Sequence, residues 1–473
     1  MQYDILIVII VPLVLVHLLT HLIKRVSIAS VKDYLVSGRQ LGVVSGALVL
    51  TFATCSGWYG LGSPAIMYRY GYIEFILFSL WAIGAVLMWF FLGSWMRDTS
   101  MELESYTVPE TIAKLHGGSI VAFLSLGILT VMGVLAFAVG QLTAIARIIS
   151  VFSGFDFTTA AVIGATICLS YLALSGLWGI LATSIAAALL MYSTILFEFV
   201  FAINKFGGII GMDEIVTKLS PQHAVITGEP YGVGYYSLIT IAIAYGLWNL
   251  LPQNTMNILA LDKKTDVRKF AVLFGLLSLV LILHLWFGIA ARIAVPPSNN
   301  MSPEDAVLKA YMELFPPWAY FVAGAAIFYM ALTTLDNLTL ATGGSILRDI
   351  ILPIAKYFGK EISDKTQVRL ARIFTILSML LILYWTVISP PPFIAFIGAV
   401  GSAALVGAYM PWIIYRFYKG TSWGIAGSCI AGIIGMLLIW YGYLGWADGI
   451  VAAAGLSVLL YILVSAVIEK TQK

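Results

Sequence analysis

The feature that most constrains this chain is the recurrence of long apolar runs along its whole length. A helix that crosses a membrane needs about 20 predominantly apolar residues. Runs of this kind, separated by short polar segments, occupy most of the 473 residues. The strands of a transmembrane barrel would instead alternate in polarity over about 10 residues. The pattern therefore predicts an all-α polytopic membrane protein.

The composition excludes several classes of protein. The chain is 61% hydrophobic and 10% charged, whereas soluble domains average about 25% charged residues. A soluble enzyme, a nucleic-acid-binding protein and a disordered scaffold are thereby excluded. The net charge of +3 requires no anionic partner, because membrane proteins concentrate basic residues on one side. Three cysteines lie far apart in apolar runs, so we predict small core residues rather than disulfides or metal ligands: Cys55, Cys168 and Cys429.

The apolar runs predict thirteen spans in a single transmembrane domain, 1–473. The spans are 4–23, 41–70, 73–96, 119–150, 157–174, 178–203, 235–260, 270–293, 317–347, 367–388, 391–415, 423–443 and 447–467. The first run has no basic segment before it and no small-residue cleavage site after it, so we expect a retained helix rather than a signal peptide. The longest segments between spans, 204–234 and 294–316, are candidates for short surface helices.

The basic residues test this count of spans. With the N-terminus outside, twenty of the 26 Lys and Arg residues fall on the cytoplasmic side and six on the other. This asymmetry is what the positive-inside rule predicts for a correct odd number of spans. We therefore expect a multi-pass protein of the plasma membrane with its C-terminus in the cytoplasm.

Two spans are interrupted by glycine and proline. The run 56–64 (SGWYGLGSP) lies inside the second span, and 246–252 (GLWNLLP) inside the seventh. The two interruptions occupy corresponding places if 41–203 and 235–415 are two halves of five helices each. Because five is an odd number, the two halves would cross the membrane in opposite orientations. Paired interrupted helices in inverted halves indicate the binding site of a secondary transporter. The alternative is that the glycines only permit close helix packing.

The ninth span carries polar residues in its inner half. An ionisable residue inside a membrane is costly unless it is paired or hydrated, so Asp336 is a functional candidate. Thr333 and Thr334 offer the oxygen ligands that a hard cation prefers, and carbonyls of a broken helix can supply more. Alternatively, the two hydroxyls bond back to carbonyls of their own helix.

Motifs along nearly the whole chain resemble those of the sodium:solute symporter family, which contains proline, pantothenate, glucose and sialic acid symporters. In chain order they are DYLVSGR at 33–39, SGWYGLG at 56–62 with Tyr68 and Gly71, TVPE at 107–110, GQL at 140–142, TTLDN at 333–337 with RDI at 348–350, and Pro411, 415–418, Thr421 and Gly424. No single motif is decisive, but their order is specific.

The resemblance implies a leucine-transporter-type fold, in which ten core helices form two inverted repeats. One helix (4–23) would precede the core and two (423–467) would follow it, which agrees with the thirteen spans counted from the runs. The resemblance also implies a Na⁺ site formed by three carbonyls and two hydroxyls. Its expected ligands are the carbonyls of Phe52, Cys55 and Met330 and the hydroxyls of Thr333 and Thr334.

The family's substrate pocket lies beside this ion. Here the resemblance points to Ser56, Gly57, Trp58, Tyr59, Gln141, Trp248 and Asn249. We expect the aromatic faces to sandwich or gate the solute and the two amides to fix its polar groups.

Three departures from the family pattern affect the expected site. The fifth core helix reads Thr183-Ser184 where many members have Thr-Asp, which favours a single Na⁺. Asn257 stands where an arginine is frequent, and Thr54 where many amino-acid carriers have an acidic residue. A strongly cationic solute therefore has no obvious partner, with Asp336 and Glu198 as the remaining candidates.

These observations predict Na⁺-driven symport of a small organic solute into the cell: an amino acid, a carboxylate, a sugar or a similar compound. The main alternative is proton coupling through Asp336 as an ion or proton relay, or through His284. A transporter-fold sensor is less favoured, because the chain ends a few residues after the last span. A channel and an ATP-driven pump lack their motifs here. We expect no enzymatic activity, no organic cofactor, no nucleic acid and no obligate protein partner; the solute and the lipid bilayer are the expected partners.

Overall fold

The computed structural model of the chain describes residues 4–23, 28–224, 235–298, 301–391 and 394–471, and this described part is helical. Eleven of its helical stretches are long and apolar enough to cross a membrane. Two shorter apolar helices, Asp4–Leu18 and Ser237–Trp248, occupy the places of the first and seventh predicted spans. Every predicted span thus falls on a helix, while the number of thirteen crossings stays a prediction.

The helices follow one another with short connections. The first eleven are α1 (Asp4–Ile23), α2 (Val31–Val36), α3 (Val43–Gly57), α4 (Ser63–Tyr70), α5 (Ile73–Met88), α6 (Ser94–Glu102), α7 (Val108–Leu115), α8 (Ile120–Ser153), α9 (Phe157–Ser175), α10 (Leu177–Lys205) and α11 (Gly208–Leu219). The others are α12 (Tyr235–Trp248), α13 (Pro252–Leu259), α14 (Val267–Leu281), α15 (Leu285–Ala294), α16 (Pro303–Leu314), α17 (Pro317–Ser345), α18 (Leu352–Tyr357), α19 (Asp364–Ile388), α20 (Ile394–Ile414), α21 (Ser422–Trp440) and α22 (Trp446–Thr471).

Polar side chains start many of the long helices by accepting hydrogen bonds from backbone N–H groups of the first turn. Ser119 caps α8, Asp156 caps α9 and Thr421 caps α21. Gly176 separates α9 from α10 with φ 55°, and an added Cβ would lie 2.2 Å from the carbonyl oxygen of Tyr34. The polar segments between the apolar runs therefore also carry the signals that begin and end the helices.

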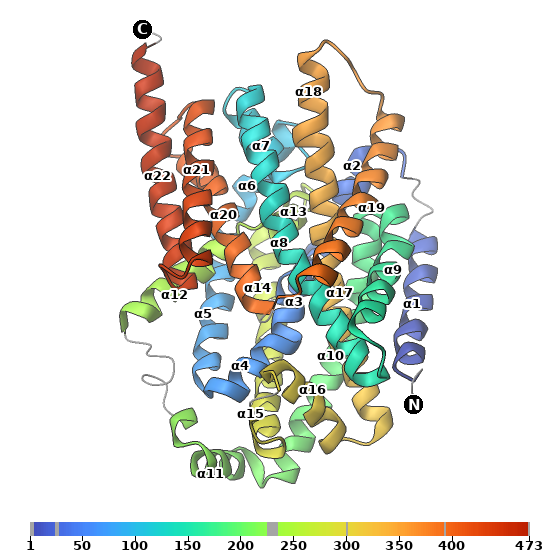
Figure 1. Cartoon of the computed structure of the whole chain (residues 1–473). Helices are drawn as coiled ribbons and strands as arrows, with labels where there is room; N and C mark the ends of the chain where they lie inside the picture. The colour runs from blue at the N-terminus through green and yellow to red at the C-terminus, as the bar shows by residue number, and fades with distance from the viewer. Residues whose placement is uncertain (1–3, 24–27, 225–234, 299–300, 392–393, 472–473) are drawn as a thin grey trace.

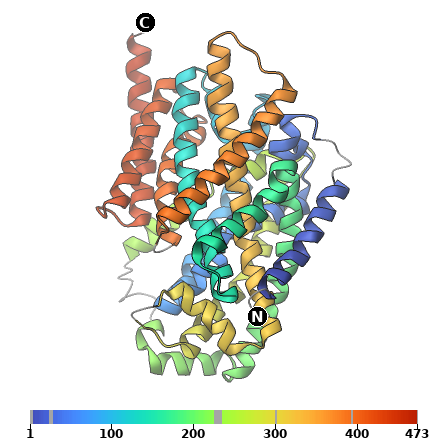
Figure 2. The ribbon, with the colours of Figure 1, turned by 45° about the vertical axis from the view of Figure 1, so that its right-hand side comes forward.

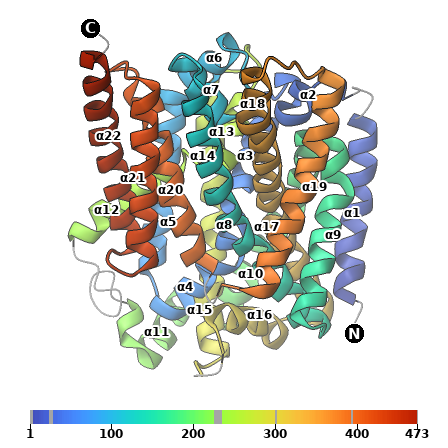
Figure 3. The same cartoon turned by 45° about the horizontal axis from the view of Figure 1, so that its top comes forward.

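The long helices run roughly along one axis around a central helix, α17 (Figure 1). This is the most buried of the eleven candidate spans, and it packs against α3, α8 and α10. The last three helices, α20 to α22, pack against one another on one side of the bundle (Figures 1 and 3). The first helix, α1, lies on the opposite side, where it contacts α10 and α17 (Figure 2).

Short helices cover the two ends of the bundle. The lower end in Figure 1 carries α11 and α16, which come from the two long segments expected to hold surface helices. Residues 225–234 of the first segment lie outside the described residues. α16 is packed rather than free on the surface, because it buries Glu304, Leu308 and Tyr311. The upper end carries α2, α7 and α18 and the C-terminus.

Two expected boundaries differ in the structure. The helix that begins with α17 continues through a π-helical segment, Ile346–Ile351, into α18, ten residues beyond the predicted end at 347. Arg348 and Asp349 do not end the helix, because their side chains turn toward α7 and find partners there. Similarly, the span predicted at 73–96 continues to Glu102.

Candidate functional site

The first broken helix lies in the middle of the bundle, where α3 meets α4. Ser56 has φ 47° and ψ 177°, which no helix allows, and a π-helical segment, Trp58–Gly62, follows it. A side chain in this backbone region costs of order 1–3 kcal/mol, and such strain occurs at functional sites. Gly57 is also packed closely, because an added Cβ would lie 2.9 Å from the Cβ of Ala144 and 3.1 Å from that of Ala331.

The two threonines of α17 face this break. Thr333 Oγ1 lies 2.9 Å from the carbonyl oxygen of Phe52 and 2.9 Å from that of Met330. Thr334 Oγ1 lies 3.1 Å from the Phe52 carbonyl oxygen and 2.9 Å from that of Ala53. The structure thus brings together Phe52, Met330, Thr333 and Thr334, and it adds the carbonyl of Ala53, which the sequence reasoning missed. We call these groups, with Cys55, the oxygen cluster.

Cys55 ends the intact part of α3, one residue before the break. Its carbonyl accepts the N–H of Trp58 rather than a threonine hydroxyl. All residues of the oxygen cluster are fully or almost fully buried. Neutral oxygens converging in a buried place are the ligands that an alkali cation finds in a broken-helix transporter. The alternative that both threonines only bond back within their own helix does not hold, because both reach α3.

The second broken helix separates α12 from α13. Residues 249–251 leave the helix, and Pro252 starts α13. The freed carbonyls are satisfied locally: Thr255 Oγ1 donates to Leu250 (2.9 Å), and Asn254 Nδ2 lies 3.3 Å from the carbonyl oxygen of Trp248. Both interruptions that the sequence predicts are therefore real breaks in the helices.

An aromatic pocket with a cavity volume of about 40 Å³ lies beside the first break. Its lining residues are Thr54, Cys55, Ser56, Trp58, Tyr59, Ser63, Glu74, Phe78, Trp81, Phe137, Tyr245 and Trp248. Trp58 and Trp248 meet edge to face with ring centroids 5.5 Å apart, which joins the two broken helices across the pocket. Small-molecule sites commonly combine a largely apolar lining with a few polar groups.

The predicted substrate residues divide into two groups. Ser56, Trp58, Tyr59 and Trp248 line the pocket. Gly57 and Gln141 are joined to each other behind it, because Gln141 Oε1 accepts the Gly57 N–H at 2.7 Å.

Asn249 is not part of the pocket lining. Its Nδ2 instead donates to the carbonyl of Tyr245 at 2.9 Å, in the last turn of α12. Contact of this amide with the solute stays a prediction, because in the structure the last turn of α12 uses its donor.

Glu74 is the residue of the pocket that sequence reasoning missed. It lies in the first turn of α5, is 1% exposed, and hydrogen-bonds the side chain of Ser63. The two acids that the sequence offered for a cationic solute, Asp336 and Glu198, do not line the pocket. The pocket lining thus holds an acid that the sequence analysis did not offer as a partner for a cationic solute. An acid inside a long apolar run was the available signal.

Asp336 faces away from the pocket, toward α9 and α10. Its Oδ2 accepts hydrogen bonds from Tyr171 (2.5 Å) and Thr183 (3.2 Å), and its Oδ1 accepts one from the thiol of Cys168 (3.0 Å). The three cysteines are free and buried, as predicted, and Cys168 in addition helps to satisfy this carboxylate.

Glu198 and His284 form a second buried polar group. Glu198 Oε2 lies 2.8 Å from His284 Nδ1, and its Oε1 accepts the hydroxyl of Tyr311 at 2.8 Å. His284 Nε2 lies 3.0 Å from the carbonyl oxygen of Gly60, which can only accept, so Nε2 carries a proton. The other ring nitrogen and the carboxylate then share one further proton. This pair contacts the broken helix just after its break.

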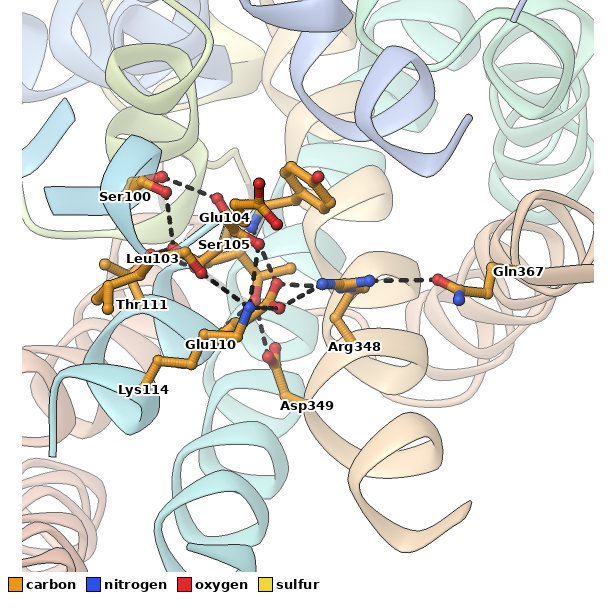
Figure 4. Close-up of polar contacts among 12 residues, drawn as sticks. Ser100, Leu103, Glu104, Ser105, Glu110, Thr111, Lys114, Arg348, Asp349 and Gln367 are labelled. Carbon is orange, nitrogen blue, oxygen red and sulfur yellow. Dashed lines mark hydrogen bonds and ion pairs between the residues drawn. The ribbon is translucent and has the colours of Figure 1, made fainter. Parts of the chain in front are cut away.

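A polar network at the upper end of the bundle joins α7 to the end of α17 (Figure 4). Glu110 binds Arg348 through both carboxylate oxygens, and its Oε1 lies 2.8 Å from Lys114 Nζ. Thr107 donates to Asp349 Oδ1 at 2.7 Å. Two motifs quoted above, TVPE and RDI, are therefore in contact although about half of the chain separates them in sequence.

The charges of this network fix the ionisation of Glu110. Burial alone would raise the pKa of the carboxyl, but Arg348 and Lys114 outweigh it and hold the pKa below its ordinary value. Arg348 also stacks over Tyr106, with its guanidinium carbon 4.8 Å from the ring centroid. The network thus joins α7 to the segment after α17 by charged hydrogen bonds.

Relatives of known sequence are symporters. A symporter of Bacillus subtilis, YhjB, described as uncharacterized, is 26% identical over 71% of this chain and 67% of its own length. A sodium/proline symporter of Haemophilus influenzae is 23% identical over 73% and 70%. An osmoregulated proline transporter of Bacillus subtilis, OpuE, is 21% identical over 87% and 83%.

Solved structures show the same fold. A Na⁺-coupled sialic acid symporter superposes with a TM-score of 0.77 at 15% identity, over 98% of both chains. Mhp1, a nucleobase-cation-symport-1 family transporter, gives 0.52 at 13% identity, over 93% of this chain and 95% of its own. The architecture is thus of the leucine-transporter type.

The family-level comparison covers most of the chain. Residues 34–435 of the chain match the sequence model of the "Sodium:solute symporter family". This range includes both broken helices, the oxygen cluster, the aromatic pocket and the Glu110–Arg348 network. The chain therefore belongs to the sodium:solute symporter family.

Proposed function

We propose that one Na⁺ binds at the oxygen cluster and drives a small organic solute from the aromatic pocket into the cell. As a member of its family the protein is a Na⁺-dependent symporter of small solutes in the plasma membrane, and it is not an enzyme. The ligands would be the carbonyls of Phe52, Cys55 and Met330 and the hydroxyls of Thr333 and Thr334. The observation that carries this proposal is the approach of both threonines to carbonyls of the broken helix.

The position of the oxygen cluster supports coupling between ion and solute. Phe52 and Cys55 lie in the turn before Ser56, and Ser56 and Trp58 line the pocket. An ion that orders this turn therefore also orders the pocket. Coupling requires that the ion binds one conformation better than the other, since equal affinity shifts no equilibrium. One charge moving inward through 100 mV supplies about 2.3 kcal/mol.

The proposed solute site comprises Ser56, Gly57, Trp58, Tyr59, Gln141 and Trp248, with Asn249 available if the second break rearranges. Four of these residues line the pocket, and Gln141 holds Gly57 behind it. Two of the relatives cited above carry proline in their names. An amino acid is therefore the first solute to test, followed by a carboxylate and a sugar.

The proposed topology follows the charge asymmetry. The N-terminus would lie outside and the C-terminus in the cytoplasm, with thirteen crossings in one domain, 1–473. The helix 4–23 would precede two inverted repeats, 41–203 and 235–415, and the helices 423–467 would follow them. The Glu110–Arg348 network would then lie at the cytoplasmic end.

The test is uptake into proteoliposomes with an inward Na⁺ gradient. The variant Thr333→Ala with Thr334→Ala removes two ligands, and we take each Na⁺–oxygen contact to contribute about as much as a hydrogen bond to a charged group, about 1.5–3 kcal/mol. Sodium affinity should therefore fall by at least about 100-fold. Unchanged Na⁺ stimulation of this double variant would refute the site.

Two further variants separate the ion site from general damage to α17. Thr333→Ser with Thr334→Ser retains both hydroxyls and should retain Na⁺ dependence. Thr339 and Thr342 bond back to Leu335 and Leu338 of their own helix at 2.7 and 2.9 Å. Replacing these two threonines by alanine removes the same atoms from the same helix and should leave Na⁺ affinity unchanged.

Proton coupling is the second candidate, and the buried Glu198–His284 pair favours it. The pair shares a proton and touches Gly60 in the broken helix, while Asp336 is a further buried acid beside the oxygen cluster. Uptake driven by a pH gradient without Na⁺, and lost in Glu198→Gln, would establish this mechanism instead.

A further inference from the structure

Glu74 is the charged residue of the aromatic pocket. Among the described residues its Oε2 has no hydrogen-bond partner, although the side chain is 1% exposed. The Ser63 side chain hydrogen-bonds the carboxyl, and no salt bridge to Glu74 is found among the described residues. Of the described side chains that line the pocket, none is basic. A buried carboxyl without a compensating cation holds a proton unless a cation joins it from outside, because an isolated buried carboxylate is costly.

The N-terminus of α5 supports a negative charge at this position. Glu74 lies in the first turn of the helix, where the backbone dipole favours anionic side chains. The pocket therefore has a fixed acidic group but, in the described part, no protein cation to accompany it.

The remaining lining is aromatic. Seven of the twelve lining residues are Trp, Tyr or Phe. Tyr59 and Phe78 lie with ring centroids 4.7 Å apart, and Phe78 and Trp81 5.2 Å apart, so the rings continue along the wall that carries Glu74. Aromatic faces attract cations, most strongly where water is excluded.

From these observations we propose that the solute carries a positively charged nitrogen, which Glu74 and the surrounding rings recognise. This inference rests on the proposed function, and it names the chemical class that the pocket accepts. A free anion would meet the carboxylate without a basic residue.

The test uses two pairs of probes that differ only in the charged nitrogen. L-proline is compared with tetrahydrofuran-2-carboxylate, in which oxygen replaces the ammonium, and choline with 3,3-dimethylbutan-1-ol, in which carbon replaces nitrogen. Binding to the purified full-length protein is measured by thermal stabilisation at saturating Na⁺. At least one probe with the charged nitrogen should bind, and its partner without that nitrogen should bind about tenfold more weakly or worse.

The variant Glu74→Gln should weaken the binding of choline or L-proline about tenfold or more, and it should leave the binding of the neutral 3,3-dimethylbutan-1-ol unchanged. The matched control is Glu304→Gln, which alters a buried carboxylate outside the pocket and should not change probe affinity. Equal binding of both members of each pair, binding of neither, or an unchanged preference in Glu74→Gln would overturn the inference.

Thermal stabilisation by Na⁺ alone distinguishes failure of the inferred solute class from failure of the proposed ion site. Glu74→Gln should keep the wild-type response to Na⁺, which also shows that it is folded. Thr333→Ala with Thr334→Ala should lose that response. If a charged probe binds equally well with and without Na⁺, the proposed coupling is wrong while the solute class stands.

Discussion

The Glu110–Arg348 network gives a prediction about conformational equilibrium. Glu110→Gln keeps the shape of the side chain and removes its charge. Glu110 is 2% exposed and binds Arg348 with both oxygens. Removing one partner of a buried ion pair costs about 3–5 kcal/mol. The low end applies here, because Arg348 keeps Gln367 at 3.2 Å and the ring of Tyr106.

A cost of about 3 kcal/mol corresponds to roughly 100-fold in the equilibrium between closed and open forms of this end. The cost falls on the closed form alone if the two side chains separate when this end opens. Hydrogen exchange measures the change directly. Amides of 100–116 and 345–352 should exchange about 100-fold faster in Glu110→Gln, while those of α21 should not change.

The matched control is Lys114→Met. Lys114 also binds Glu110, but its side chain is 30% exposed, so its loss should cost less than about 1 kcal/mol. Exchange in Glu110→Gln that is no faster than in Lys114→Met would refute the reasoning.

The pH dependence of this contact has a defined sign. Because the pKa of Glu110 is held below its ordinary value, the contact is complete above that value and is lost only as the pH falls through the lower one.

Two further predictions concern helix packing. Burial lowers the pKa of His116 to about 4, so stability should fall by roughly 2 kcal/mol between pH 6.5 and pH 5, where only the unfolded chain takes up the proton. His116→Gln should flatten this dependence in chemical denaturation, and parallel curves would contradict it. Gly57→Ala should abolish Na⁺-dependent uptake without loss of membrane insertion, because its Cβ would collide with Ala144 and Ala331. Gly455→Ala, whose Cβ meets open space on α22, is its control, and equal uptake by both variants would disprove the packing argument.

Much of the fold follows from local patterns in the sequence. A run of apolar residues must be helical in a membrane, because its backbone groups have no other partners. Glycine and proline inside such a run then mark a break, and both predicted breaks are present at Ser56 and at 249–251. The helix ends were less predictable, since the continuation past Ser345 depends on partners that α7 supplies.

The pocket was less predictable than the oxygen cluster. The cluster needs two adjacent hydroxyls and one broken turn, which sequence motifs reveal. The pocket is assembled from side chains of α3, α4, α5, α8 and α12, and no local pattern reports that meeting. Glu74, which no motif singled out, becomes part of the lining, whereas the Asn249 amide bonds the last turn of α12.

The ion pair at the upper end has a consequence for how the two halves of the chain depend on each other. Glu110 comes from the first half and Arg348 from the second, and both side chains are largely shielded from water in the assembled molecule. A fragment that contained one half would leave its charged side chain without this partner. However similar their architecture, the two halves are therefore complementary pieces, and neither could substitute for a second copy of the other.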